Sequence, residues 1–251
     1  MNKFLSLLSA ATVLALGGQA QATELVTNGS FEQTTNGAGE FGPHGGTTAT
    51  GWTSSGYNFI IAAGSADTTG AHSTQYNNQM ALWGPNNGSA NGLPAASPDG
   101  GNFIGEDGAY QTGALSQTIN GLVAGQKYAV SFDWAGAQQH GFDGKNTEQF
   151  IVSLGDESKA TKVYHNPSHG FSGWMQQTFV FTATDSSETL SFLAKGTPNG
   201  VPPFSLLDGV SMTASVPEPA TWTMMILGIG GVGAIARRRR AAGLAAGAAA
   251  A

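Results

Sequence analysis

Apolar and polar residues alternate with a period of two in several short segments of the chain. In the segment KYAVSFDWA, one parity holds Tyr128, Val130, Phe132 and Trp134, and the other holds smaller or polar residues. This period is typical of a β-strand with one buried face, because successive side chains of a strand point to opposite sides. The segments WMQQTFVFTAT and TLSFLA repeat the pattern, with these predicted inward residues: Met175, Phe179, Phe181, Ala183, Leu190, Phe192 and Ala194.

Further strands are predicted between segments rich in turn-forming residues. Glycine accounts for 37 of the 251 residues, which is about twice its usual share. Short strands joined by turns predict an all-β fold, a β-sandwich. Less regular strand candidates lie at residues 24–32, 57–62, 79–83, 102–105, 115–120, 148–154 and 204–213.

The chain is acidic, with 16 acidic and 10 basic residues and a net charge of -6. All four arginines lie together at 237–240, so the middle of the chain is more acidic still. From Glu24 to Asp208, fifteen acids and five lysines give a net charge of about -10. Such a charge excludes nucleic acid as an expected partner.

Residues 1–22 are predicted to be a signal peptide. Lys3 supplies the positive start, residues 4–16 form an apolar run, and Ala20-Gln21-Ala22 fits a cleavage site. The alternative is a first core helix. Because an exported chain without cysteine has no disulfides, its stability must come from its core or from a bound metal.

Residues 220–236 carry no charge and are predicted to form one C-terminal transmembrane helix. A helix of this length spans about 25 Å, against a hydrocarbon thickness of about 30 Å. The arginines that follow would stay cytoplasmic and orient the span. The alternative, an apolar core helix, is disfavoured by the four glycines and the lack of an amphipathic pattern.

Pro217-Glu218-Pro219 and Trp222 stand at the start of this uncharged segment, and the arginine cluster follows it. This arrangement resembles the PEP-CTERM protein-sorting signal, in the variant with tryptophan after the motif. The resemblance implies an exported protein that is anchored in the inner membrane, processed by an exosortase-type membrane enzyme near Pro-Glu-Pro, and then located in the envelope or outside the cell, in organisms that make exopolysaccharide. Thr223 stands where the variant usually has alanine, and residues 241–251 form an additional Ala/Gly-rich tail. The residues that carry the resemblance are Pro217, Glu218, Pro219, Trp222, Arg237, Arg238, Arg239 and Arg240.

The middle of the chain resembles the galactose-binding-like jelly roll of carbohydrate-binding modules. The fragments LVTNGSFE, GW, GALSQTINGLVAGQKYAVSFDWAG and LLDGVSM occur in the order that this family uses. The resemblance implies a β-sandwich with a tendency to bind glycans, and it names no particular sugar. The predicted organisation is 1–22 signal peptide, 23–213 sandwich, 214–240 sorting signal and 241–251 tail.

The sequence lacks the signatures of common hydrolases and nucleotide enzymes, so a non-catalytic protein is expected. It has no G-x-S-x-G, no cysteine and no phosphate-binding loop. In HNPSHG, His165 and His169 are four residues apart, but the proline and glycine favour a loop over a metal-binding helix. A glycosidase would need a carboxylate pair drawn from these loop acids: Glu106, Asp107, Asp143 and Glu148.

Aromatic residues in glycine-rich loops are the candidates for ligand binding, since aromatic rings offer sugars an apolar face. Trp83 and Trp174 are the predicted binding residues, while Trp134 is expected in the core. The expected function is an envelope or extracellular-matrix protein with polysaccharide as candidate ligand. A structural or adhesive matrix protein without a ligand site is the first alternative, and a polysaccharide-degrading enzyme is the second.

Asp208 is predicted to lie on the inward face of the last strand, by parity with Phe204, Leu206, Val210 and Met212. A carboxylate there must be hydrogen-bonded, protonated or bound to a cation. The jelly-roll resemblance implies a structural Ca²⁺ where the first and last strands meet, with Glu32 and Asp208 as ligands. The alternative is that Asp208 fixes a loop through hydrogen bonds.

Overall fold

A computed structural model describes residues 23–42, 45–72, 79–215 and 237. The predicted signal peptide 1–22, the span 220–236 and the tail 241–251 lie outside the described residues, as do the sorting residues other than Arg237. Within the described ranges, no helix combines the length and apolar character needed to cross a membrane.

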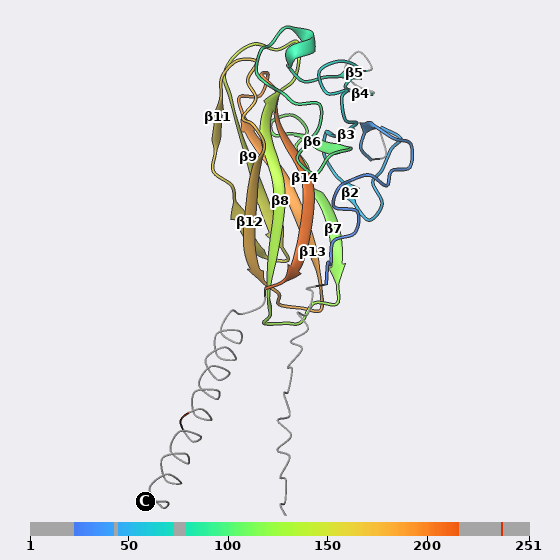
Figure 1. Cartoon of the computed structure of the whole chain (residues 1–251), viewed down its shortest axis with the longest axis vertical. Coiled ribbons are helices and arrows are strands. Elements are labelled where there is room, and N and C mark those ends of the chain that lie inside the picture. The colour runs from blue at the N-terminus through green and yellow to red at the C-terminus, as the bar shows by residue number, and fades with distance from the viewer. Residues whose placement is uncertain (1–22, 43–44, 73–78, 216–236, 238–251) are drawn as a thin grey trace, which may run out of the picture.

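Two antiparallel six-stranded sheets form a β-sandwich, which confirms the predicted all-β class (Figure 1). The first sheet has the order β1-β3-β6-β14-β8-β12, with bounds Gly39–Glu40, Asn58–Ile61, Phe103–Asp107, Pro203–Ala214, Lys127–Gln138 and Met175–Thr182. The second has the order β10-β9-β13-β7-β2, with β11 paired to β9 and bounds Glu157–Ala160, Asn146–Leu154, Ser187–Thr197, Leu115–Asn120, Thr53–Ser54 and Tyr164–Asn166. A small hairpin and a 3₁₀ helix complete the described elements: β4 Ala71–His72, β5 Gln79–Met80 and η1 Pro85–Asn87.

The main core lies between the two sheets and is built from the residues that alternation predicted. The inward side chains of β8 are all buried, and Phe132 meets Phe192 of the other sheet edge to face at 5.1 Å. Trp134 packs on Phe150 at 6.3 Å. Met175 and Phe179 of β12 are only partly buried against this core. β12 is therefore an edge strand with incomplete cover.

A second hydrophobic cluster covers the outer face of the first sheet. Phe59, Phe103 and Phe204 come from neighbouring strands, and Met80 and Leu82 come from the chain that packs over them. The strands β3 (NFII) and β6 (FIGED) are buried on both faces, which explains why their apolar and polar residues do not alternate. The loops between β3 and β6 thus form part of the folded domain.

The predicted strand at residues 24–32 is wrong. The chain makes one isolated bridge, from Glu24 to Thr213, and then turns. Asn28 and Phe31 have φ values of 53° and 56°, which a strand does not allow. Trp52 holds this turn, because its Nε1 donates to the carbonyl of Asn28 at 3.0 Å.

The predicted face of Asp208 is also corrected, because β14 contains a β-bulge. Asp208 pairs with Asp133, yet Ser211 pairs with Ser131, so the bulged strand has one extra residue. Gly209 takes the left-handed conformation that this bulge requires, with φ 57°. The parity of the strand therefore changes. Asp208 shares the outer face with Phe204 and Leu206, whereas Val210 and Met212 face the main core.

Candidate functional site

A pocket of about 300 Å³ opens at one end of the sandwich, where several strands of the first sheet begin or end. Antiparallel pairing places the start of β3, the end of β6 and the start of β14 at the same end of the sheet, beside the end of β8. Its lining residues come from these strand ends and their loops: Tyr57, Asp107, Tyr110, Gln139, Phe142, Asn199, Gly200 and Pro202.

Asp107, the last residue of β6, is the charged group of this pocket and is 2 % exposed. Its Oδ1 accepts the backbone N–H groups of Ala109 at 2.8 Å and Tyr110 at 3.0 Å. Its Oδ2 is buried and has no hydrogen-bond partner among the described residues. Burial raises the pKa of Asp107 to about 6, against the lowering effect of the two N–H donors. The pocket therefore contains an acceptor that a ligand hydroxyl could satisfy.

Aromatic rings form the apolar part of the pocket. Tyr57 is buried and meets Tyr110 edge to face, with ring centroids 5.6 Å apart. Tyr110 is 42 % exposed, and its hydroxyl accepts a hydrogen bond from Gln111 at 3.0 Å. Phe142 lines the same pocket from the loop after β8. An exposed ring beside a buried acceptor suits a ligand with both apolar faces and hydroxyl groups.

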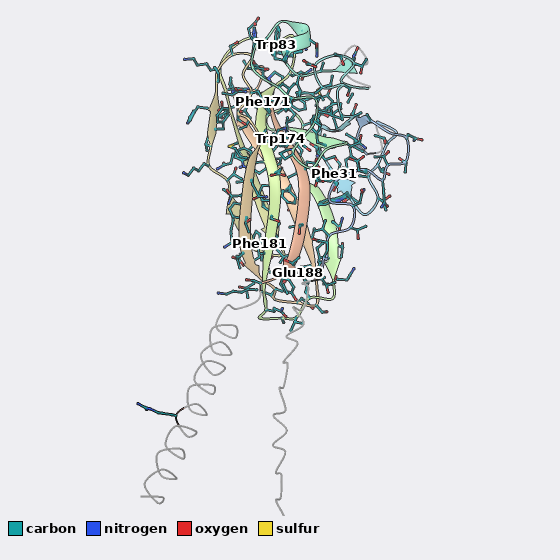
Figure 2. The ribbon with its side chains drawn as sticks, in the orientation of Figure 1. Phe31, Trp83, Phe171, Trp174, Phe181 and Glu188 are labelled. Atoms are coloured by element: carbon teal, nitrogen blue, oxygen red, sulfur yellow. The ribbon has the colours of Figure 1, made fainter. Side chains whose placement is uncertain are left out.

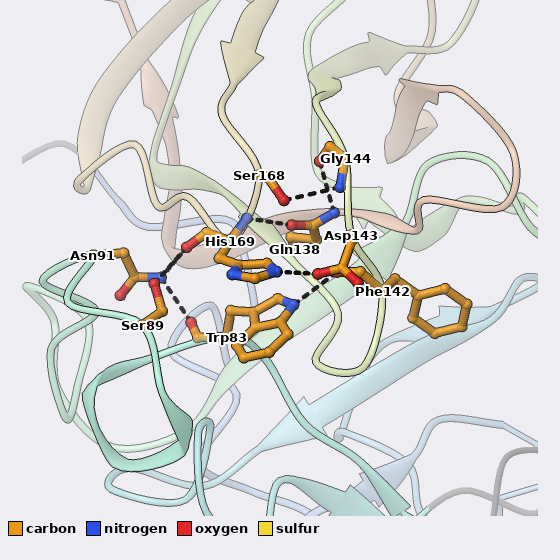
Figure 3. Close-up of polar contacts among 9 residues, drawn as sticks. All are labelled: Trp83, Ser89, Asn91, Gln138, Phe142, Asp143, Gly144, Ser168 and His169. Atoms are coloured by element: carbon orange, nitrogen blue, oxygen red, sulfur yellow. Dashed lines mark hydrogen bonds and ion pairs between the residues drawn. The ribbon is translucent and has the colours of Figure 1, made fainter.

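Trp83 holds the loop that carries Phe142 (Figure 3). The Trp83 Nε1 donates to the Phe142 carbonyl at 2.9 Å. One ring face stacks on His169 at 3.7 Å between centroids, and His140 meets the indole at 4.4 Å. Trp83 is partly buried by these contacts. The indole positions a loop of the pocket without lining the pocket itself.

His169 is fixed in turn by a network that sequence reasoning missed. Its Nε2 pairs with Asp143 Oδ1 at 2.5 Å, and its backbone N–H donates to Gln138 Oε1 at 2.5 Å. Ser89 and Asn91 donate to its carbonyl at 2.8 and 2.9 Å. His169 has φ 62°, a conformation that these bonds stabilise. The predicted loop in HNPSHG is confirmed for His169, whereas His165 lies in strand β11, so the prediction is wrong there. The residue spacing alone carried no signal for the stack.

The second predicted binding residue, Trp174, lies apart from Trp83. Figure 2 shows Trp83 at the end of the sandwich that is opposite to Glu188, whereas Trp174 lies closer to its middle. Trp174 meets Phe103 edge to face at 5.6 Å and is partly buried against the outer cluster. The structure does not bring the two indoles into one platform. Their role in ligand binding stays a prediction.

Two of the predicted candidate acids lie inside the sandwich. Glu106 accepts the N–H of Ala194 from the other sheet at 3.2 Å, and Glu148 accepts from Asn166 at 3.0 Å. Both glutamates are fully buried. Burial raises the pKa of Glu148 to about 8 and that of Glu106 well above its usual value. Asp143, by contrast, is exposed and paired with histidine.

Asp208 is fully buried and tied to the loop before β6. The Ser97 hydroxyl donates to its Oδ2, while its Oδ1 has no partner among the described residues. Burial, together with the smaller effects of the charges of Asp99 and Glu32, raises the pKa of Asp208 to about 8, against the lowering effect of the Ser97 hydroxyl and the Gly209 N–H. Glu32 accepts the N–H of Asn102 at 2.6 Å, so both acids hold the same loop. This bears out the hydrogen-bonded alternative for Asp208.

No group of three or more acidic or histidine side chains in the described part of the chain has the arrangement of a metal site. Asp99 and Glu32 both interact electrostatically with Asp208, but these described carboxylates do not come together in a group that could hold a metal ion. The fit to calcium is therefore incomplete, and the calcium ion stays a prediction.

Comparison with protein families gives two matches. Residues 215–240 match the PEP-CTERM protein-sorting motif, which confirms the predicted resemblance and marks the chain as exported. Residues 24–212 match the family described as protein of unknown function DUF642. No curated protein matches the chain.

Among solved structures, the chain is similar to several carbohydrate-binding modules. TmCBM61 in complex with beta-1,4-galactotriose is 16% identical, with 77% of this chain and 100% of that one covered and a TM-score of 0.40. The CBM22-1 xylan-binding domain from Paenibacillus barcinonensis Xyn10C is 11% identical, with 77% and 95% covered and a TM-score of 0.40. A CBM4 structure is 17% identical, with 75% and 99% covered and a TM-score of 0.34.

Proposed function

The chain belongs to the DUF642 family, and from that premise we propose that its sandwich is a non-catalytic module that binds polysaccharide through the Asp107 pocket. The observation that carries this proposal is that Asp107 lines the pocket and that its buried Oδ2 has no hydrogen-bond partner among the described residues. Sugar hydroxyls supply the donor that this oxygen lacks. The sugar C–H faces suit the exposed ring of Tyr110.

The size of the pocket supports a ligand of limited length. Its volume of about 300 Å³ lies at the lower end of the range for small-molecule sites. A chain end or a short segment of a polysaccharide would fill such a pocket. The loop held by Trp83 keeps Phe142 in place, so the pocket is formed before the ligand arrives.

A non-catalytic role is supported by the positions of the acids. Glu106 and Glu148 lie between the sheets, where a polysaccharide cannot reach them. Asp143 is held by His169, and Asp107 is the acid that lines the pocket. A glycosidase requires two carboxyl groups on opposite sides of the scissile bond.

Export through an exosortase-type processing enzyme and anchoring by the C-terminal helix complete the proposal. The match of residues 215–240 to the sorting motif supports both. The mature domain would then act in the cell envelope or outside the cell.

Binding of the full-length protein to an array of neutral oligosaccharides tests the pocket. We expect Asp107→Asn and Tyr110→Ala each to weaken binding at least about tenfold, which is about 1.4 kcal/mol. The asparagine side chain keeps one carbonyl oxygen as an acceptor for the two backbone N–H groups, so folding should be preserved. Asp156→Asn serves as a matched control, because Asp156 is exposed and does not line the pocket.

Two results would contradict the proposal. Unchanged affinity in both pocket variants would move the ligand elsewhere. Failure to bind any glycan would favour the structural or adhesive matrix protein, and release of reducing ends that Asp107→Asn abolishes would favour the enzyme.

A further inference from the structure

A groove crosses the outer face of the second sheet, away from the Asp107 pocket. It consists of two hollows of about 570 and 370 Å³ that share Thr147 and Thr197 as lining residues. β9 and β13 line the first hollow, and the edge strand β11 lines the second. The two hollows therefore adjoin at this pair of threonines, and the two together are called the groove.

The register of the strands places polar side chains in rows along this groove. Thr147 pairs with Thr197 on one side and with His165 on the other, and Gln149 pairs with Lys195 in the next row. Partners in an antiparallel register point to the same face of a sheet. Their neighbours along the strands are buried in the main core, so these rows face outward.

The charge of the groove is opposite to that of the domain. Lys145, His165 and Lys195 line it and are exposed, and no acidic residue stands among the described lining residues. Lys159 forms an ion pair with Glu157. Neither Lys145 nor Lys195 forms an ion pair within the part of the chain that the structure describes.

The acid nearest to these rows along the chain does not offset the lysines. Glu148 lies between Thr147 and Gln149 on β9, but its side chain points inward and is fully buried. Burial raises its pKa to about 8, so it is largely neutral at pH 7. Asp143, two residues before Lys145, pairs with His169 and does not line the groove. The lining of the groove therefore carries positive charge and no acidic residue, in a domain whose net charge is about -10.

We propose that this groove binds a strand of acidic polysaccharide. Lys145 and Lys195 would pair with carboxylate or sulfate groups of the polymer, and His165 would add a third charge when protonated. The hydroxyl and amide groups of Thr147, Thr197 and Gln149 would bond sugar hydroxyls along the strand. A linear polymer suits two adjoining hollows, and the lack of Phe, Tyr or Trp among their described lining residues favours charge over stacking. This inference takes from the proposed function only the class of ligand, a polysaccharide. The groove and its residues differ from the Asp107 pocket.

Affinity electrophoresis of the full-length protein tests the groove with four probes: polygalacturonate, dextran sulfate, neutral dextran and polyphosphate. We expect retardation by polygalacturonate or dextran sulfate, none by neutral dextran, and weaker retardation as salt rises. Preference for one of the two polymers identifies the anionic group. Lys145→Gln with Lys195→Gln should weaken this binding about tenfold.

The double variant Lys127→Gln with Lys159→Gln is the matched control, since it removes the same charge outside the groove. Asp107→Asn should leave the acidic polymers bound, so the groove and the pocket can fail independently. Equal loss in the control variant, no retardation by either acidic polymer, or equal retardation by polyphosphate would overturn the inference.

Discussion

At the scale of single residues, Trp83 shows how one side chain can position a ligand pocket that it does not line. Its ring stacks on His169, and its Nε1 reaches the carbonyl of Phe142. We expect Trp83→Phe to keep the stack and to lose the hydrogen bond, which lowers the free energy of unfolding by about 1 kcal/mol. Trp83→Ala should lower it by about 3 kcal/mol. Urea unfolding measures both changes. Equal stability of Trp83→Phe and the original protein would contradict a stabilising role of the hydrogen bond from Trp83 to Phe142.

Asp208 gives a second prediction at this scale, because the loop tie and the predicted calcium ion differ in their consequences. The observed bond predicts that Ser97→Ala lowers the free energy of unfolding by about 1–3 kcal/mol, since a buried oxygen loses its partner. A calcium ion held with Glu32 predicts, in addition, that a chelator lowers the melting temperature and that Asp208→Ala removes this response. Melting curves with and without chelator separate the two. A stable Ser97→Ala variant would contradict the loop tie.

At the scale of elements, strands with one solvent-exposed face were predictable from the sequence, and strands with both faces buried were less so. The alternation predicted the start of β8 at Lys127, and the less regular candidate at 115–120 has the bounds of β7. β14 deviates because Gly209 forms a bulge, and parity carries no information about a single left-handed residue. The predicted strand at residues 24–32 was wrong for the same reason, because Phe31 is left-handed as well.

The residues of the pocket were harder to predict from the sequence than the strands. Tyr57, Asp107 and Tyr110 were recognisable as candidate residue types, but they are spread along the chain with Phe142 and Pro202. Only the antiparallel order of β3, β6, β14 and β8 brings these loops to one end of the sheet. The sequence favoured the indoles instead, because tryptophan in a polar loop is a stronger general signal than a buried aspartate.

At the scale of the whole molecule, the sorting motif determines where the sandwich can act. If the arginines orient and retain the tail, replacing Arg237–Arg240 by alanine should impair both retention and processing. The secreted form in the native host should therefore lack these four residues. Mass spectrometry of the extracellular protein checks this, and an intact C-terminus on that protein would contradict the processing.

The stability of the whole domain should fall as pH rises, because buried carboxyl groups are protonated in the folded state. Burial raises the pKa of Glu148 from 4.5 to about 8 and that of Glu106 well above 4.5. Above about pH 4.5 the unfolded chain releases protons that the folded chain keeps, so each group's contribution is complete below that pH and is lost as pH approaches its folded pKa. The slope is up to about 1.4 kcal/mol per pH unit for each group. Urea unfolding between pH 5 and 8 should therefore show decreasing free energy, with a shallower slope for Glu148→Gln and an unchanged slope for the exposed control Asp156→Asn. A flat profile in the original protein would mean that these carboxyl groups are ionised and compensated inside the sandwich.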